Sequence, residues 1–153
     1  MADNDNRLTL ETTKGNVVIE MRPDLAPGHV ERIKQLVNEG FYDGIVFHRV
    51  IDDFMAQTGC PQGTGTGGSG QKLKAEFSKE KHVRGTVSMA RANNPDSGDS
   101  QFFICFTEAP WLNGQYTVWG QVTEGMDNVD KIKRGEPVSD PDKIVTARMA
   151  ADQ

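Results

Sequence analysis

The sequence predicts an all-β domain, and three observations support that fold class. Short runs rich in β-branched and aromatic residues recur along the chain, polar and glycine-rich turns separate them, and only two segments have helical apolar spacing. The 153 residues are close to the commonest size of a single domain. We therefore expect one domain over residues 1–153, built as a barrel or sandwich.

The first elements are two strands that follow a polar start. Residues 1–6 are polar, and we expect them to form a disordered tail. Apolar residues then alternate at positions 8 and 10 and again at 17, 19 and 21, on either side of Lys14-Gly15-Asn16. This alternation predicts a β-hairpin with a Gly-Asn turn.

The strongest helical signal follows the hairpin. Between Leu25 and Gly40, apolar residues at 26, 30, 33, 36 and 37 have helical spacing, with Pro27 in the first turn and Gly40 at the end. A shorter helix is predicted over 126–133. The predicted later strands are 45–51, 54–58, 86–89, 101–106, 117–122 and 144–149.

Composition excludes several classes of protein. Seventeen Lys and Arg against twenty-two Asp and Glu give a net charge of −5, which argues against a nucleic-acid binder. Two cysteines allow at most one disulfide. The start has neither a basic nor an apolar stretch, and no run approaches the ~18 apolar residues of a membrane span. We expect a cytoplasmic protein without membrane or nucleic-acid partners.

Several familiar signals lack their required context, so we expect no cofactor and no metal. Gly63 to Gly70 matches the dinucleotide fingerprint G-x-G-x-x-G, but Cys60-Pro61 precedes it and no helix start follows. A mobile surface loop is the preferred interpretation. The three histidines have no metal-ligand spacing, and no serine sits in a nucleophile elbow.

Three segments, 47–57, 88–104 and 111–120, concentrate aromatic, methionine, arginine and glutamine residues. On strands with a two-residue period, the expected groupings by face are Phe47 with Arg49 and Ile51, Met55 with Gln57, Gln101 with Phe103, and Phe102 with Ile104. Converging faces would form an apolar wall with one cation and two amides. The pattern alone leaves an ordinary core and a ligand pocket both open.

These segments also resemble a known family. The strings Phe-His-Arg-Val-Ile-x-x-Phe-Met-x-Gln-x-Gly, Gly-Thr-Gly-Gly, Ser-Met-Ala-Arg, Ser-Gln-Phe-Phe-Ile and Trp-Leu-Asn-Gly, together with 41–44, are similar to those of cyclophilin-type peptidyl-prolyl cis–trans isomerases. The similarity runs from about Leu8 to Met149 and is closer to bacterial cytoplasmic members. It implies a closed eight-stranded antiparallel β-barrel capped by two α-helices.

The resemblance also implies the site residues. Arg49 matches the catalytic arginine. The matching substrate-binding positions are Phe54, Met55, Phe103 and Leu112 for the proline pocket, Gln57 and Gln101 for the substrate backbone, Ala90 and Arg91 for the edge strand, Gly65 and Thr66 for the glycine loop, and Trp111 and Tyr116 for the pocket rim.

Two positions depart from the best-known eukaryotic members: Arg91 stands where they carry Asn, and Tyr116 where they carry His. Trp111 matches the aromatic residue associated with cyclosporin binding, so cyclosporin A is an expected inhibitor, weakened by the loss of the imidazole. The departures bear on affinity and sequence preference more than on activity.

The resemblance implies a cofactor-free isomerase that acts on X–Pro bonds in unfolded or folding proteins, as a monomer assisting folding. Rotation about a peptide bond requires no nucleophile and no net proton transfer, so the lack of a catalytic triad is consistent with it. A non-catalytic proline-peptide binder on the same barrel is the alternative, and a small-ligand barrel is more remote. Arg49 favours the enzyme, because a pure binder has little need of it.

Overall fold

The computed structural model describes residues 6–150. Its strands are β1 (Arg7–Thr12), β2 (Gly15–Met21), β3 (Arg49–Ile51), β4 (Met55–Thr58), β5 (Thr86–Met89), β6 (Phe102–Cys105), β7 (Val118–Glu124) and β8 (Ile144–Met149). Its helices are α2 (Pro27–Asn38), the short α3 (Met126–Val129) and a 3-10 turn, η1 (Pro110–Leu112). The prediction of a mostly β chain with eight antiparallel strands and two α-helices is confirmed.

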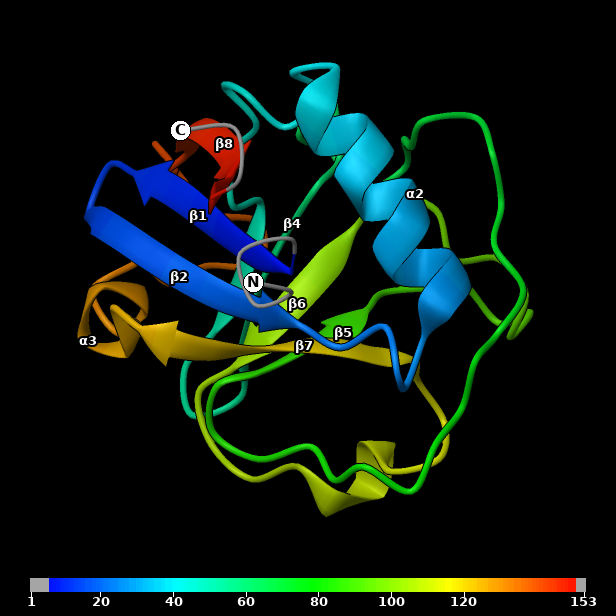
Figure 1. Ribbon diagram of the computed structural model, residues 1–153. Helices are drawn as coiled ribbons and strands as arrows, with labels where there is room; N and C mark the ends of the chain where they lie inside the picture. The colour runs from blue at the N-terminus through cyan, green and yellow to red at the C-terminus, as the bar shows by residue number, and fades with distance from the viewer. Residues whose placement is uncertain (1–5, 151–153) are drawn as a thin grey trace.

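The eight strands form one curled antiparallel sheet in the order β3-β4-β6-β5-β7-β2-β1-β8 (Figure 1). Strands β3 and β8 are its edges, and no ladder between them is present in the described residues. The sheet is therefore a curled half-barrel, whereas a closed barrel was expected. Helix α2 lies against β8, and α3 lies against β2 at the opposite side in Figure 1.

The first hairpin forms as predicted, but its turn lies two residues earlier than expected. Gly15 pairs with Thr12, so the turn residues are Thr13 and Lys14, and the Gly-Asn turn is wrong. Gly15 has φ +125°, and a Cβ there would meet the Asn128 side chain at 2.6 Å. The close approach of α3 therefore accounts for the glycine.

Helix α2 confirms the strongest helical prediction. Pro27 occupies its first turn, where the missing N–H costs nothing, and Gly40 follows its end with φ +75°. The buried face contains His29, Val30, Ile33, Leu36 and Val37. The second helix is shorter than the predicted 126–133, because regular helical hydrogen bonding stops at Val129 and turns continue the chain.

Of the expected disordered tail, residues 1–5 lie outside the described residues. Asn6 is held in place: its carbonyl accepts the Met21 N–H at 2.6 Å, and its Oδ1 accepts a hydrogen bond from Lys34 Nζ at 3.0 Å. Asn6 is therefore not part of a disordered tail, contrary to the expectation for this residue. Among residues 6–150, no helix combines the length and apolar character needed to cross a bilayer.

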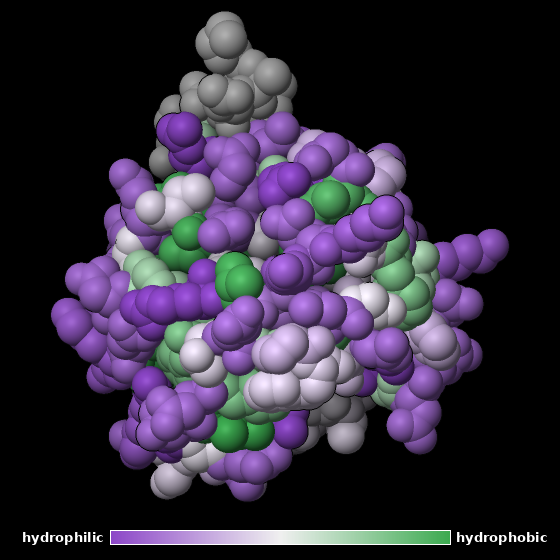
Figure 2. Space-filling view, turned by 90° about the horizontal axis from the view of Figure 1, so that it is seen from below, coloured by the Kyte–Doolittle hydropathy of each residue, from purple (hydrophilic) through white to green (hydrophobic). Residues whose placement is uncertain are grey.

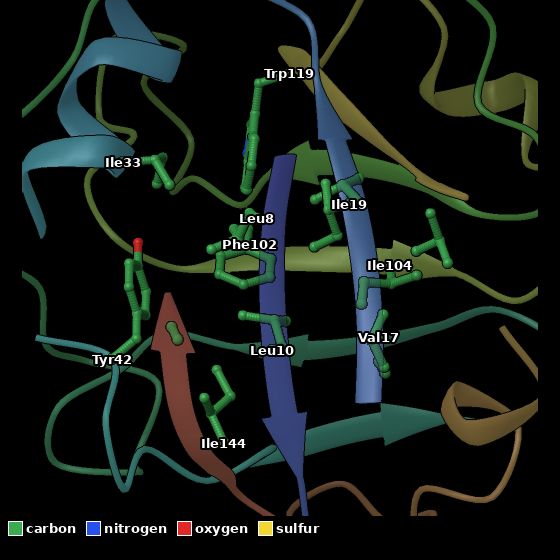
Figure 3. Packing of buried hydrophobic residues seen from close by; sticks show 14 of the residues in the cluster. Leu8, Leu10, Val17, Ile19, Ile33, Tyr42, Phe102, Ile104, Trp119 and Ile144 are labelled. Carbon is green, nitrogen blue, oxygen red and sulfur yellow. The ribbon is translucent and has the colours of Figure 1, made fainter. Parts of the chain in front are cut away.

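The main core fills the inside of the curled sheet. Figure 3 shows side chains of β1 and β2 facing those of β6 and β7, with Ile33 of α2 and Tyr42 at the border. Phe102 is central, with its ring centroid 5.2 Å from that of Trp119 and 5.6 Å from that of Tyr42, both in edge-on geometry. These rings are almost completely buried.

Register across β3, β4, β6 and β5 decides which residues face outward. Val50, Ala56, Ile104 and Val87 form one cross-strand row and belong to the main core. The neighbouring row is Arg49, Gln57, Phe103 and Ser88. Because successive residues of a strand point to opposite faces, this second row lies on the outer face of the sheet.

The expected face groupings are confirmed except for one. Phe47 belongs to the main core, whereas Ile51 packs in a second cluster outside it, with Met55 and Phe103. The expectation that Phe47 shares a face with Arg49 is wrong because regular strand structure begins only at Arg49. Alternation does not extend through the irregular segment before it.

Candidate active site

Two adjoining cavities lie on the outer face of the sheet. The first, here called the apolar pocket, has a volume of about 120 Å³ and is lined by Arg49, Phe54, Met55, Gln57, Ala90, Arg91, Phe103, Leu112 and Tyr116. The second, the loop pocket, has about 290 Å³ and is lined by Gln57, Gly65, Thr66, Gly67, Gly68, Lys72, Ala90, Arg91, Ala92, Ser97, Asp99 and Gln101. They share Gln57, Ala90 and Arg91. Every predicted site residue except Trp111 lines one or both.

The walls of the apolar pocket come from three elements. Met55 of β4, Phe103 of β6 and Leu112 of η1 are nearly buried and form the second cluster with Cys105 and Ala109. Outward-facing positions of β4 and β6 supply the floor, and η1 closes one side. Tyr116 meets the Phe103 ring edge-on at 5.7 Å between centroids. These apolar side chains bound one part of a space large enough for a small ring, and Arg49, Gln57 and Arg91 bound the rest.

Trp111 lies at the edge of this pocket. Its side chain is 63% exposed, and its ring centroid is 5.8 Å from that of Phe54. Figure 2 views the molecule from the η1 side of Figure 1 and shows a mostly hydrophilic surface with small separate hydrophobic patches. An exposed indole offers apolar area and one N–H donor to a ligand that extends beyond the pocket.

A chain of hydrogen bonds joins the predicted polar residues. Arg49 Nη1 donates to Gln57 Oε1 at 3.2 Å, and Gln57 Nε2 donates to Gln101 Oε1 at 2.9 Å. Gln101 Nε2 then donates to the carbonyls of Gly65 and Gly67 at 3.0 and 2.9 Å. Because a guanidinium can only donate, Arg49 sets the orientation of both amides and hence the direction of the whole chain.

The glycine loop lies on the surface, as expected, and hydrogen bonds anchor it near both ends. Cys60 Sγ accepts the N–H groups of Gly65 and Gly67 at 3.3 and 3.2 Å. Asp99 accepts those of Ser69 and Gly70 at 2.9 and 3.0 Å. With the Gln101 bonds, these contacts give the loop pocket a defined wall.

The two departures from the eukaryotic pattern contact one another. The Arg91 guanidinium lies 4.6 Å from the centre of the Tyr116 ring, a cation–π arrangement. Its Nε and Nη2 both donate to the Gln115 carbonyl, at 3.0 and 2.8 Å. Arg91 therefore holds the segment that carries Tyr116, in addition to lining both cavities.

Two residues that sequence reasoning missed support this site. Glu136 Oε2 accepts a hydrogen bond from Arg49 Nε at 2.8 Å. The His82 ring stacks on Phe103 at 6.2 Å between centroids and 19° between planes, and its Nε2 lies 2.9 Å from Ser88 Oγ. No local sequence pattern identifies Glu136, because its partner Arg49 is 87 positions away in the sequence. His82 could have been noticed as a histidine that stands four positions before the predicted strand 86–89.

Burial sets the titration of the groups near the site. Burial lowers the pKa of His82, although its hydrogen bond to Asn113 opposes this, and burial together with the nearby Arg49 charge lowers the pKa of His48. Burial raises the pKa of Cys105 to about 12. For Cys60, burial acts in the same direction, but backbone N–H groups led by Gly67 outweigh it and lower the pKa to about 7.

The geometry supports three actions on a ligand. The apolar pocket can enclose a small ring, the amides of Gln57 and Gln101 can hold backbone groups, and Arg49 can donate a charged hydrogen bond at the pocket wall. Within residues 6–150, no three His, Cys, Asp or Glu side chains gather closely enough to hold a metal ion.

Comparisons with known proteins agree with this geometry. The family model described as cyclophilin type peptidyl-prolyl cis-trans isomerase/CLD matches residues 7–149. A probable peptidyl-prolyl cis-trans isomerase of Brucella suis is 54% identical, over 99% of this chain and 86% of that protein. Peptidyl-prolyl cis-trans isomerase B of Bacillus subtilis is 47% identical, over 80% and 87% respectively.

Solved structures show the same fold. A cyclophilin from Hirschia baltica matches with a TM-score of 0.91 and 33% identity, over 99% of this chain and 76% of that one. A Cryptosporidium parvum cyclophilin type peptidyl-prolyl cis-trans isomerase, crystallised in the presence of the dipeptide Ala-Pro, matches with a TM-score of 0.87 and 28% identity, over 94% and 98%.

Proposed function

Because the chain belongs to the cyclophilin-type peptidyl-prolyl cis–trans isomerase family and therefore catalyses rotation about X–Pro bonds, we propose that Arg49 is its catalytic residue. One observation carries this proposal: the Arg49 guanidinium lines the same small pocket as the apolar side chains of Met55, Phe103 and Leu112. A proline ring seated there has its nitrogen within the reach of a fixed cation.

Rotation requires loss of amide resonance, and the barrier for a peptide bond is about 18–20 kcal/mol. In the twisted state the prolyl nitrogen becomes pyramidal, and its lone pair can accept a hydrogen bond. A guanidinium donor at that position stabilises the twisted state more than the planar ground state, which is the condition for catalysis. Arginine suits the role because it stays charged and its donors are rigidly arranged.

The rest of the site holds one end of the substrate while the other turns. The proline ring occupies the apolar pocket, the amides of Gln57 and Gln101 hold the substrate backbone, and Ala90 with Arg91 form the edge along which the peptide lies. The residue before proline lies toward the loop pocket beside Gly65 and Thr66. The two pockets meet at Gln57, which supports this direction of the chain.

We also propose that the sheet behaves as a closed barrel, which keeps the Arg49 strand in place. Backbone hydrogen bonds support this closure: Phe47 N donates to the Asp142 carbonyl at 2.8 Å, and Ile144 N donates to the Ile45 carbonyl at 2.8 Å. They join the segments that lead into the edge strands β3 and β8. Slow hydrogen exchange at these two amides would support closure, and exchange as fast as in an exposed loop would contradict it.

A direct rate measurement tests the activity. Isomerisation of a short X–Pro peptide, followed by a protease-coupled assay or by NMR exchange, should accelerate in proportion to protein concentration. The uncatalysed reaction takes tens of seconds or more, so acceleration is easily measured. Peptide binding without acceleration would instead identify a non-catalytic proline-peptide binder.

Cyclosporin A is the inhibitor that we propose for this site, competing with peptide. Trp111 supplies an exposed indole at the rim, and the pocket walls beside it are apolar. Inhibition should appear in the isomerase assay, and Trp111→Ala should weaken it. Unchanged rates at high micromolar cyclosporin would contradict this proposal.

Proline-containing segments of unfolded and folding proteins are the clients that we propose, acted on by a monomer in the cytoplasm. Slow prolyl isomerisation limits the folding of many proteins, and this activity removes that limit. Cys60 and Cys105 are both free thiols, which fits a reducing compartment. Accelerated refolding of a proline-limited substrate protein and a monomeric mass in solution would be the supporting results.

A further inference from the structure

We propose that Glu136 is a positioning residue for isomerisation, which orients the Arg49 guanidinium toward the substrate; the inference rests on the proposed catalytic role of Arg49. Glu136 Oε2 accepts a hydrogen bond from Arg49 Nε at 2.8 Å, within an ion pair. Neither the pocket lining nor the sequence motifs include Glu136.

The backbone brings these two side chains together. Val50 and Gly135, the neighbours of the pair, exchange two backbone hydrogen bonds, each of 2.8 Å. Val138 N also donates to the His48 carbonyl at 3.0 Å. The segment before β8 is thus fastened to His48 and to Val50, the two chain neighbours of Arg49. This fastening reduces the conformational entropy that is lost when the side chains meet.

Gly135 permits this close approach. A Cβ at this position would lie 2.7 Å from Val138 Cα and 2.8 Å from the Pro137 carbonyl oxygen. These are backbone atoms, so a larger residue would displace the turn that presents Glu136. Gly135 is therefore needed for the turn that places the Glu136 carboxylate beside Arg49.

Some N–H donors of Arg49 bind neighbouring protein groups, and the others are free to bind substrate. A guanidinium has five N–H groups: the one on Nε points to Glu136, and one on Nη1 points to Gln57. These two bonds hold adjacent sides of the planar group and so fix its rotation. The remaining donors are available at the wall of the apolar pocket, where the twisted peptide bond forms.

Glu136 also begins the chain of hydrogen bonds that continues through Arg49, Gln57 and Gln101 to the glycine loop. Arg49 donates on both sides, through Nε to the Glu136 carboxylate, which can only accept, and through Nη1 to Gln57 on the way to the loop. The carboxylate partly offsets the arginine charge, but it lies on the Nε side and is 59% exposed, so water screens it. Orientation is therefore its main effect on the rate.

Steady-state kinetics on an X–Pro peptide tests this role with two variants of Glu136. Glu136→Ala removes the acceptor and should lower kcat about three- to tenfold with KM changed less than twofold, since ground-state contacts remain. Glu136→Gln keeps a neutral oxygen for Arg49 Nε and should restore kcat to within about twofold of the parent. Rescue by Gln is not expected of a residue whose charge alone matters.

Asp52→Ala is the matched control. Asp52 forms a similar exposed ion pair with Arg134, at 3.2 Å between Oδ1 and Nε, and neither residue lines the apolar pocket or the loop pocket. Both Ala variants should unfold at temperatures close to the parent, and only Glu136→Ala should lose kcat. Equal kcat for Glu136→Ala and Asp52→Ala would overturn the proposal, and so would higher kcat in Glu136→Gln than in the parent.

A double-mutant cycle separates this inference from the proposed function. Adding Glu136→Ala to Arg49→Ala should cause no further loss of kcat, because the carboxylate acts through the arginine. A further loss in the double variant would contradict the positioning role. If Arg49→Ala itself retained full activity, the proposed function of Arg49 would fail, whichever result Glu136 gave.

Discussion

The main core and the second cluster contain the same kinds of side chain, but the second cluster borders the apolar pocket. Phe102 and Phe103 are neighbours on β6, yet Phe102 is enclosed by Tyr42 and Trp119, whereas Phe103 lines an open pocket. Both are nearly buried, with exposures of 1% and 5%. Burial alone therefore does not distinguish a residue that is enclosed by protein from one that lines a cavity.

The Phe102 and Phe103 rings differ in whether protein contacts both of their faces. Phe102 is contacted on all sides by protein, so its apolar area contributes to stability. Phe103 contacts Tyr116 and His82 on the protein side and leaves space on the other. That unfilled apolar surface gains its contacts when a ligand arrives. Substitutions in the two regions should therefore separate stability from activity.

Phe102→Ala should have the largest effect, on stability. Removing a ring enclosed by protein leaves a cavity in the main core, and such changes cost about 3–5 kcal/mol. Urea denaturation measures the loss as a lower midpoint. At a temperature where the variant remains folded, its KM should be close to that of the parent. A loss below about 1 kcal/mol would contradict the distinction between the two regions.

Arg49→Ala should have the next largest effect, and on activity alone. Hydrogen bonds to charged groups contribute roughly 1.5–3 kcal/mol, and each ~1.36 kcal/mol is tenfold in rate, so kcat/KM should fall about ten- to a hundredfold or more. The loss should be mainly in kcat, because the pocket walls and the Gln101 contacts remain. Near-full activity in a folded variant would refute the electrostatic mechanism.

Phe103→Ala should weaken peptide binding and cost less stability than Phe102→Ala. Losing one apolar wall of the pocket removes roughly 1.4 kcal/mol of ring contact, so KM should rise about tenfold. Paired urea titrations of the two Ala variants, with KM for each, make the comparison directly. Equal stability losses and unchanged KM would show that Phe103 is an ordinary core residue.

Acidification should have the smallest effect, a loss of stability that arises beside both the main core and the second cluster. Burial lowers the pKa of His29, beside the main core, and of His82, beneath the second cluster, while the Glu76 carboxylate opposes the shift at His29. Because the unfolded chain takes up protons that the folded chain resists, stability should be full above about pH 6.5 and fall as pH decreases.

Urea titrations at pH 7 and pH 5.5 should show a decrease on the order of 1 kcal/mol. Replacing His29 by Gln should reduce the slope while leaving part of it, since His48 and His82 still resist protonation. A stability that is constant over this pH range would contradict neutral buried histidines.

Much of the fold could be predicted from local patterns. Alternation over 7–12 and 15–21 and the helical spacing of 27–38 each depend on a few neighbouring residues, and both elements formed as expected. The hairpin turn was misplaced because Gly15 suits a turn as well as a close contact with Asn128, and only the packed structure distinguishes them. Phe47 was misassigned for a similar reason, since alternation requires a regular strand.

Sequence motifs were sufficient to nominate the site, and twelve of the thirteen predicted residues line the two cavities, with Trp111 at their rim. Motif spacing carries this information because strand period determines which residues share a face. It carried none about the orientation of the Gln57 and Gln101 amides, which depends on hydrogen bonds between different strands.

The sequence by itself determined the order of the strands, the long helix and the family, and it nominated the residues that line the two cavities, because these depend on short-range periodicity and on motifs. Only the tertiary structure decided that Glu136 meets Arg49, that Arg91 covers Tyr116, and that the glycine loop is tied to Cys60. These contacts join segments that local patterns treat as independent. Their partners are chosen by strand register and loop closure, which are properties of the whole folded chain.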